Sequence, residues 1–263
     1  MYPRLNKRLG QHHLTRGEVC RPLLDFLQPA GRRVLEIGPG SGVLTRGLLD
    51  AGAEVLAVEL DPAWAIVAAR ELRNEPVRVV VADALDLDWA RLPAPTLVAG
   101  NLPYNVGTAI VARILPRHRN VPRAGFLLQL EVARRLAASP GSRDYGQLTV
   151  MARCYARPRI LATVKPGAFR PPPKVDSAFV GFELAPPPLP EDEMPAFLEL
   201  VRQGFAHKRK TVRNSLAARW DRDRVDDLLR RAGIGSRERG EELSVERWLD
   251  LHEAAVATGI LRP

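Results

Sequence analysis

The stretch Val34-Leu35-Glu36-Ile37-Gly38-Pro39-Gly40-Ser41-Gly42 joins a short apolar run to a loop with three glycines at alternate positions. Glycines in such a loop let the backbone turn sharply and come close to a ligand. The apolar run over residues 34–37 is typical of a strand buried on both faces of a parallel sheet. The stretch therefore predicts the first strand-to-helix turn of a Rossmann-like domain, with a nucleotide-type ligand at the carboxyl ends of the strands.

Similar apolar runs recur along the following part of the chain, with helix-like segments between them. They predict a mostly parallel, doubly wound α/β sheet, with strands over residues 34–37, 55–59, 77–82, 97–100 and 126–130 and crossover helices such as 44–51 and 62–73. Two later runs, 160–164 and 178–184, are separated by little more than a Pro-rich stretch and predict an antiparallel pair at one sheet edge. Residues 171–173 are all proline and cannot lie inside a strand.

The Pro-rich segment 185–190 (APPPLP) predicts a stiff linker between two domains. Beyond it the strand pattern ends, and residues 194–205, 211–219, 224–232 and 245–258 are typical of helices, with Ser244 as the N-cap of the last. We therefore expect an α/β domain over residues 1–185, which begins with the basic segment 1–33, and a small helical domain over residues 186–263.

Composition narrows the class of protein before any motif is considered. The chain has 263 residues and a net charge of +9, a balance that favours a polyanionic partner, either nucleic acid or an anionic membrane surface. Its two cysteines, Cys20 and Cys154, form no CxxC pair, which fits a reducing compartment. The basic start is followed by no apolar signal region, and no apolar run reaches the roughly 18 residues of a membrane span, so we expect a cytoplasmic protein.

Three acidic residues stand at or near the ends of the first three predicted strands. Glu36 precedes the glycine loop, Glu59 ends the second strand and Asp83 follows the third. The G-x-G-x-G spacing of Gly38, Gly40 and Gly42 differs from the dinucleotide pattern G-x-G-x-x-G, and a carboxylate beside it would repel a pyrophosphate. S-adenosylmethionine carries an amino group and a sulfonium, so Glu36 favours it, while Glu59 and Asp83 can accept from ribose and adenine. The alternatives are a plain tight turn and solvated or helix-capping carboxylates.

The sequence Asn101-Leu102-Pro103-Tyr104-Asn105 follows the fourth predicted strand. An aromatic amine is a poor nucleophile because its lone pair is delocalised into the ring. The Asn101 amide oxygen and the Leu102 carbonyl can each accept one N–H, which aims the lone pair at a methyl group and stabilises the charge that develops. Tyr104 offers a ring on which a flipped base can stack. An ordinary turn after a strand is the alternative.

These motifs resemble those of the ribosomal RNA adenine dimethylase family, and the resemblance covers nearly the whole chain. Its pieces are Leu9-Gly-Gln-His-His-Leu14, the loop from Glu36 to Gly42, Glu59-Leu-Asp61, Asp83-Ala84, the segment from Asn101 to Asn105, Gln129-Leu-Glu-Val132, Tyr145-Gly146, Ala168-Phe-Arg-Pro-Pro-Pro-Lys-Val-Asp-Ser177 and Lys208-Arg-Lys-Thr-Val-Arg-Asn-Ser-Leu216.

The resemblance implies a class I methyltransferase fold, S-adenosylmethionine as the cofactor and N6,N6-dimethylation of adenine in rRNA. It implies that the cofactor pocket is formed by His12, Leu14, Gly38, Glu59, Asp83 and Asn101, and that Tyr104 and Phe169 sandwich the target adenine. His12 stands where members often carry Asn, and His13 where Phe is usual. Too few further ligands are suitably spaced for a metal site at these histidines.

A basic run in the C-terminal part predicts where RNA binds. Residues 202–219 hold six Arg or Lys and no acid, with Lys208, Arg209, Lys210 and Arg213 as the candidate phosphate contacts. A solvated charged face is the alternative. The resemblance implies that the C-terminal helices help to seat the RNA.

The resemblance also implies a partner, small-subunit (16S) rRNA within the ribosomal subunit or its precursor. It implies that the protein has a role linked to subunit biogenesis. We expect a monomer with no membrane partner. The nearest alternative is an Erm-type enzyme that acts on large-subunit rRNA, against which residues 208–216 and Glu241-Glu-Leu-Ser-Val245 argue. A Rossmann oxidoreductase and a non-enzymatic assembly factor are the other classes considered.

Overall fold

The computed structural model describes Pro3 and residues 11–207 and 209–261. Its contacts divide the chain into two compact units, one comprising Met1–Arg134 and Ala156–Pro186, the other Arg135–Tyr155 and Pro187–Pro263. The units are therefore not two continuous segments, because residues 135–155 pack with the C-terminal helices. The functional division into a cofactor-binding part over 1–185 and an RNA-binding part over 186–263 stays a prediction.

The first unit is built on a seven-stranded sheet with the order β4-β3-β2-β5-β6-β9-β7. The strands of this sheet are β2 (Arg33–Ile37), β3 (Glu54–Glu59), β4 (Val77–Val81), β5 (Thr96–Asn101), β6 (Arg123–Gln129), β7 (Ala156–Val164) and β9 (Ser177–Leu184). The five strands from β4 to β6 are parallel, and β9 runs antiparallel to both β6 and β7. This arrangement confirms the predicted parallel sheet with an antiparallel edge pair.

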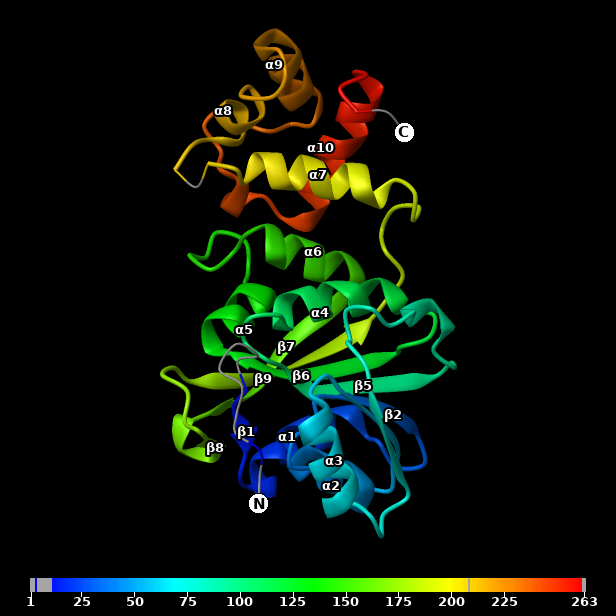
Figure 1. The fold of residues 1–263 in the computed structure, drawn as a ribbon. Coiled ribbons are helices and arrows are strands. Elements are labelled where there is room, and N and C mark those ends of the chain that lie inside the picture. Colours follow the sequence, from blue (N-terminus) through cyan, green and yellow to red (C-terminus); the bar gives the residue numbers. More distant parts are fainter. Residues whose placement is uncertain (1–2, 4–10, 208, 262–263) are drawn as a thin grey trace. The chain divides into compact units, whose positions relative to one another are not determined.

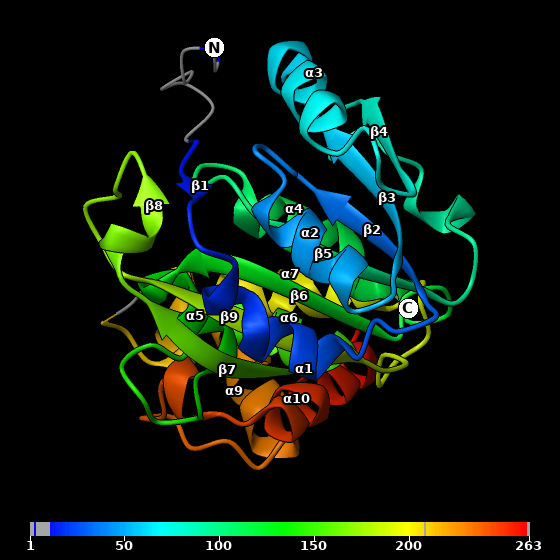
Figure 2. The same cartoon turned by 90° about the horizontal axis from the view of Figure 1, so that it is seen from below.

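Helices cover both faces of this sheet. Figures 1 and 2 show α1 (Arg21–Leu27), α2 (Val43–Asp50) and α3 (Pro62–Glu71) on one face, and α4 (Gly107–Ile114) and the start of α5 (Leu130–Ala137) on the other. Apolar side chains of α1 and α2 pack on the sheet in a cluster that includes Leu23 and Leu48. The predicted crossover helices over 44–51 and 62–73 correspond to α2 and α3.

A second, two-stranded sheet was not expected from the sequence. It pairs β1 (His13–Leu14) with β8 (Phe169–Arg170) in antiparallel register, so that His13 faces Arg170 and Leu14 faces Phe169. Figures 1 and 2 both show these strands side by side. Strands of two residues carry no periodic signal, and their partners lie more than 150 positions apart in the chain.

The second unit is helical. Its helices are α6 (Gln147–Tyr155), α7 (Met194–Gly204), α8 (Val212–Leu216), α9 (Arg222–Arg231) and α10 (Val245–Ala257). Helix α7 contacts α6, α8 and α10, and α9 contacts α8 and α10 (Figure 1). Trp248 is fully buried at the centre, and the absence of a side chain at Gly204 makes room for its ring. Ser244 caps α10 as predicted, accepting from the Arg247 N–H at 3.4 Å.

Gly100 lets two parallel strands meet closely at their carboxyl ends. It pairs with Ile37 across the β2–β5 ladder. A Cβ atom at position 100 would lie 2.6 Å from the Ile37 carbonyl oxygen, which is backbone and cannot rotate away. The close approach places Asn101, the next residue, beside the glycine loop, where a Cβ on Gly38 would lie 3.7 Å from the Asn101 carbonyl oxygen.

We predict that Gly100→Ala destabilises the first unit by about 1–3 kcal/mol, because the added methyl group overpacks against backbone. Gly17→Ala is the matched control, since a Cβ at position 17 meets nothing within 4 Å. Urea unfolding monitored by circular dichroism checks both variants. Equal midpoints for the two variants would contradict the close approach.

Candidate active site

A cavity lies at the carboxyl ends of β2, β3 and β5, where the strand order reverses direction in a doubly wound sheet. It brings together residues from the N-terminal segment, the glycine loop, the end of β3 and the turn after β5. Its lining consists of Gln11, His12, His13, Gly38, Glu59, Leu60, Asn101, Leu102, Pro103, Tyr104, Asn105 and Val106.

The N-terminal segment is held across this cavity by hydrogen bonds to distant parts of the chain. The Asn101 side-chain N–H donates to the His12 carbonyl oxygen at 2.7 Å, and His12 Nδ1 donates to the Pro171 carbonyl oxygen at 2.8 Å. Thr15 follows on, with its backbone N–H donating to the Ala168 carbonyl oxygen at 3.0 Å. These bonds fix residues 12–15 between the turn after β5 and the β8 segment.

The hydrogen bond to His12 also orients the Asn101 side chain. Because Nδ2 is engaged by the His12 carbonyl, the amide oxygen Oδ1 is the acceptor end of the group. The backbone of the next residue is fixed in the same way, since the Leu102 N–H donates to the Leu127 carbonyl oxygen at 3.2 Å. The Leu102 side chain is buried with 1% exposure, so the turn is anchored in the core. The two expected acceptors are thus held on a rigid turn.

Tyr104 lies on the same turn, with its ring partly buried. Its hydroxyl and that of Ser177, at the start of β9, are 2.5 Å apart. Burial raises the pKa of the Tyr104 hydroxyl, and the hydrogen bond with Ser177 opposes the shift. The His12 ring lies 5.2 Å from the Tyr104 ring, tilted by 31°. The phenol is therefore neutral and anchored at its hydroxyl end, which suits a stacking surface better than a proton donor.

Glu59 presents a largely buried carboxylate to the cavity. Its Oε1 accepts from the Asp61 N–H at 3.0 Å and its Oε2 from the Gly40 N–H at 3.3 Å. Burial raises the pKa of Glu59, while these backbone N–H groups lower it and the nearby Asp61 charge adds to the rise. The carboxylate is thus positioned by backbone and keeps acceptor capacity for hydroxyl groups of a ligand.

Glu36 lies beneath the glycine loop, with 1% exposure. Its Oε2 has no hydrogen-bond partner among the described residues. Burial raises the pKa of Glu36 to about 8, the nearby Thr45 hydroxyl opposes the rise, and the charge of Glu59 adds to it. A buried carboxyl group without a counter-charge is costly, because the charged form is poorly solvated. A cation near the glycine loop would relieve that cost.

His13 forms the wall of the cavity over the glycine loop. Its ring stacks on Trp64 of α3, with centroids 4.0 Å apart and planes inclined by 23°. A Cβ at position 40 would lie 2.1 Å from His13 Nδ1, so only glycine fits beneath the ring. Burial lowers the pKa of His13 to about 4, and His12 adds to the fall. The neutral ring adds no positive charge beside a cationic ligand.

The structure brings only some of the predicted residues to the cavity surface. His12, Gly38, Glu59, Asn101, Leu102 and Tyr104 line it, whereas Leu14, Glu36, Gly40, Asp83 and Phe169 do not. Phe169 and Leu14 are each 4% exposed and pack in the apolar cluster with Phe179. A stacking role for Phe169 stays a prediction.

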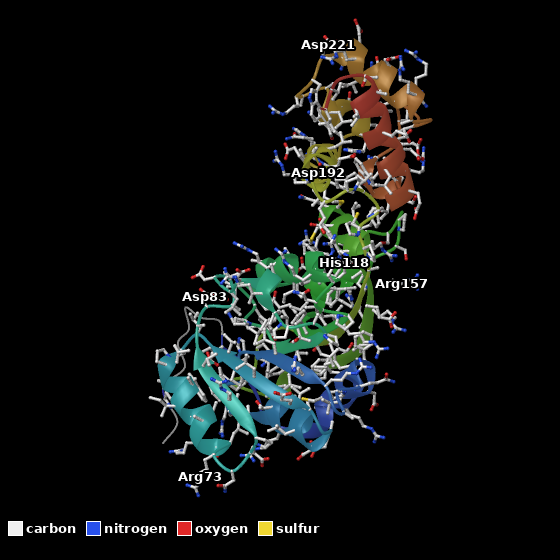
Figure 3. All side chains as sticks on the ribbon, turned by 90° about the vertical axis from the view of Figure 1, so that its right-hand side faces the viewer. Arg73, Asp83, His118, Arg157, Asp192 and Asp221 are labelled. Atoms are coloured by element: carbon white, nitrogen blue, oxygen red, sulfur yellow. The ribbon has the colours of Figure 1, made fainter. Side chains whose placement is uncertain are left out.

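Asp83 lies in the turn after β4, where it is labelled in Figure 3. Its Oδ1 accepts from the Leu85 N–H at 2.8 Å, so in this structure it caps its own turn. Two functional candidates escaped sequence reasoning. Ser177 ends one of the motifs that resemble the dimethylase family, and Leu60 lies inside another, directly after the predicted acid Glu59.

The basic residues of the C-terminal unit separate into two kinds. Arg209 and Lys210 are exposed. Arg213 instead makes a two-point ion pair with Asp226, in which both N–O distances are 2.5 Å, and the pKa of Asp226 is lowered by it. Lys208 lies outside the described residues. Phosphate contacts by these residues stay a prediction, and Arg213 is the least free to make one.

Within residues 11–207 and 209–261, no group of three or more His, Cys, Asp or Glu side chains is arranged to hold a metal ion. In the same part of the chain, no helix is both long and apolar enough to cross a membrane.

The chain is similar to known proteins over nearly its whole length. Residues 3–256 match the family described as Ribosomal RNA adenine dimethylase. Proteins named Ribosomal RNA small subunit methyltransferase A are similar over nearly their full length. That of Thermosynechococcus vestitus is 41% identical over 95% of this chain and 96% of its own. That of Acidithiobacillus ferrooxidans (strain ATCC 23270) is 39% identical over 98% of this chain and 97% of its own.

Solved structures share the fold. The 23S rRNA methyltransferase ErmE is 30% identical, covers 91% of this chain and 97% of its own, and has a TM-score of 0.69. A dimethyladenosine transferase from Plasmodium falciparum is 21% identical, covers 94% of this chain and 98% of its own, and has a TM-score of 0.79. The match over residues 3–256, with the 39–41% identity of the two named relatives, shows that the chain belongs to the ribosomal RNA adenine dimethylase family.

Proposed function

We propose that this chain transfers methyl groups from S-adenosylmethionine to the N6 amine of adenines in small-subunit rRNA, giving N6,N6-dimethyladenine. One observation carries the proposal. The Asn101 amide nitrogen is engaged by the His12 carbonyl oxygen at 2.7 Å, so its oxygen is left as an acceptor in a cavity shared with Glu59 and Tyr104. The Asn101 oxygen can accept from an amine that is neutral at first and becomes positive as it reacts. Beside it, Tyr104 offers a ring for stacking and Glu59 a carboxylate that favours a cationic ligand.

The work of the protein at the amine is orientation and charge stabilisation. Asn101 Oδ1 and the Leu102 carbonyl oxygen each accept one N–H of the adenine amine, which favours a pyramidal nitrogen whose lone pair is less delocalised into the ring. As the nitrogen gains positive charge, both hydrogen bonds strengthen, so they stabilise the transition state more than the ground state. Tyr104 holds the base by stacking, and no strong base is needed before the methyl group arrives.

The residues present fit S-adenosylmethionine. Glu59 has an orientation fixed by backbone and can accept from ribose hydroxyls. Glu36, whose Oε2 has no hydrogen-bond partner among the described residues, lies under the loop that approaches the ligand. Gly38, Gly40 and Gly42 all have positive φ angles, between 53° and 81°, which glycine adopts without strain. When bound, this cofactor supplies a methyl group activated by a sulfonium.

The choice of small-subunit rRNA rests on the names of the relatives that are 37–41% identical to this chain. We infer the same substrate here, within the small subunit or its precursor, and hence a role in subunit biogenesis in the compartment where subunits are made, which in bacteria is the cytoplasm. The similarity to ErmE keeps large-subunit rRNA as the alternative substrate. A monomeric state stays a prediction.

We expect the purified chain to methylate small subunits that lack the modification and to leave large subunits unmodified. Both subunits should be tested as substrates with radiolabelled S-adenosylmethionine, and the product identified as dimethyladenosine by mass spectrometry of digested rRNA. Incorporation into the large subunit alone would favour the Erm-type alternative. Incorporation into neither would reject the proposal.

We predict that Asn101→Ala lowers kcat by roughly 10²–10³, by analogy with removal of one oxyanion-hole donor, because the lost interaction is stronger in the transition state. The affinity for rRNA should change little. Steady-state methylation at saturating subunits measures the effect. If the variant keeps the wild-type kcat, the segment from Asn101 to Asn105 is only a turn and has no role in the reaction.

Ser177 supplies the matched control for Tyr104. If the Tyr104 hydroxyl only anchors the ring, Tyr104→Phe and Ser177→Ala should behave alike, each losing the same hydrogen bond at a cost of about 1 kcal/mol and retaining most activity. Tyr104→Ala removes the stacking surface and should raise KM for the subunit. A large loss of kcat in Tyr104→Phe alone would give the hydroxyl a chemical role.

Glu36 leads to a prediction about pH. Its pKa of about 8 keeps the carboxyl group protonated at pH 7 in the free protein. A bound cation favours the charged form, so binding lowers the pKa and releases up to one proton, and affinity rises as the pH is raised toward 8. Calorimetry in two buffers of different ionisation enthalpy measures the release. Glu36→Gln should abolish the proton release that comes from Glu36 and leave any release that comes from Glu59.

A further inference from the structure

The C-terminal unit contains a cavity that the predicted basic run only borders. It lies between α8, α9 and the turn that follows α9. Figure 3 labels Asp221, the residue immediately before α9. Its volume is about 650 Å³, within the range of about 300–1,000 Å³ usual for ligand sites. The polar part of its lining includes Arg213, Asn214, Asp226, Arg230, Ser236 and Arg237.

The charges in this lining leave two guanidinium groups facing a ligand. Three arginines stand against one carboxylate, and that carboxylate, Asp226, is neutralised by Arg213 through two N–O contacts of 2.5 Å. Arg230 is 74% exposed and shares Asp227 with Arg231, so this trio keeps a positive charge. Arg237 is exposed and is engaged by no ion pair within the described part of the chain. An anion is therefore the favoured occupant.

The turn that carries Ser236 and Arg237 is fixed in place by its neighbour Glu238. The Gly235 N–H donates to Glu238 Oε1 at 2.6 Å, and Arg247 of α10 holds the same carboxylate through both of its terminal nitrogens. The Val212 N–H donates to the Glu238 carbonyl oxygen at 2.9 Å, which ties the turn to the start of α8. The turn that carries Arg237 is thus ordered before a ligand binds, so binding loses less conformational entropy there.

The cavity also has an apolar part. Leu229 and Ile234 belong to its lining and are 3% and 4% exposed. A site that combines two guanidinium groups, neutral hydrogen-bonding side chains and an apolar surface matches a phosphodiester together with its ribose and base edge. The exposed Lys210 immediately precedes Thr211, another lining residue, so a strand contacting the basic run can continue into the cavity.

We propose that this cavity binds one nucleotide segment of the rRNA strand, with Arg230 and Arg237 contacting its backbone phosphates. The inference rests on the proposed rRNA substrate and adds a contact site beyond the basic run over residues 208–213. Arg213 then serves as a positioning residue that neutralises Asp226, which would otherwise repel the phosphate.

The test compares two double variants of the full chain. Arg230→Ala with Arg237→Ala removes the two cavity guanidiniums that are not paired with Asp226, and Arg222→Ala with Arg224→Ala removes the same charge from α9 outside the cavity lining. All four side chains are exposed, so both variants should fold. Affinity for small subunits and for protein-free small-subunit rRNA is measured over a salt series, with inorganic phosphate and a mononucleotide as competitors.

We expect the cavity variant to bind both RNA substrates roughly ten-fold more weakly, with the slope of log K against log salt reduced by about 1.4–1.8 for two lost contacts at 0.7–0.9 each. The α9 control should lose clearly less. Cofactor affinity and kcat at saturating subunits should stay at the wild-type level, and competition should require RNA rather than phosphate or mononucleotide alone.

Several outcomes would overturn the site. If RNA affinity falls equally in the two double variants, the effect comes from net charge and not from the cavity. Loss of affinity for intact subunits but not for free rRNA would assign the cavity to a ribosomal protein, and displacement by free phosphate would assign it to a small anion. Failure of the proposed function is distinct, because then the wild-type chain would itself methylate no subunit.

Discussion

The close approach of β2 and β5 at their carboxyl ends is the constraint on which the site depends. Because residue 100 is glycine, the end of β5 lies directly against the Ile37 carbonyl oxygen, and Asn101 is placed beside the glycine loop. Asn101 then holds His12 through one hydrogen bond, and the N-terminal segment is held across the cavity. The acceptor for the amine, the ring for the base and the carboxylate for the cofactor converge from separate strand ends because the sheet brings those ends to one edge.

Electrostatics give this edge its selectivity. Two carboxyl groups, Glu36 and Glu59, are buried near the glycine loop, and burial raises the pKa of each. The flanking His13 is kept neutral by its own burial, so no fixed cation satisfies Glu36 from that side. Such an arrangement disfavours pyrophosphate and favours a ligand that brings positive charge, which separates this cavity from a dinucleotide site of the same fold.

The C-terminal unit handles charge differently. Its 15 arginines are matched by 15 acids. Several arginines are engaged in ion pairs that hold the unit together: Arg213 with Asp226, Arg247 with Glu238, and both Arg230 and Arg231 with Asp227. These pairs fix the geometry around α8 and α9. The cavity arginines that can contact a phosphate are Arg237, which has no ion pair within the described part of the chain, and Arg230, which shares Asp227 with a second arginine. The number of basic residues in a sequence therefore overstates the number available to RNA, and the pairing pattern decides which they are.

Local patterns in the sequence determined the alternation of strands and helices, the glycine loop, the antiparallel edge pair and the turn after β5, because strand periodicity and turn chemistry depend on neighbouring residues. Long-range contacts decided the rest. The pairing of β1 with β8, the burial of Phe169, the hydroxyl contact of Tyr104 with Ser177 and the engagement of Arg213 by Asp226 join residues between 13 and 157 positions apart. The packing of residues 135–155 with the C-terminal helices belongs with them. Such contacts follow from which surfaces the folded chain brings together, and no pattern of spacing along the sequence records them.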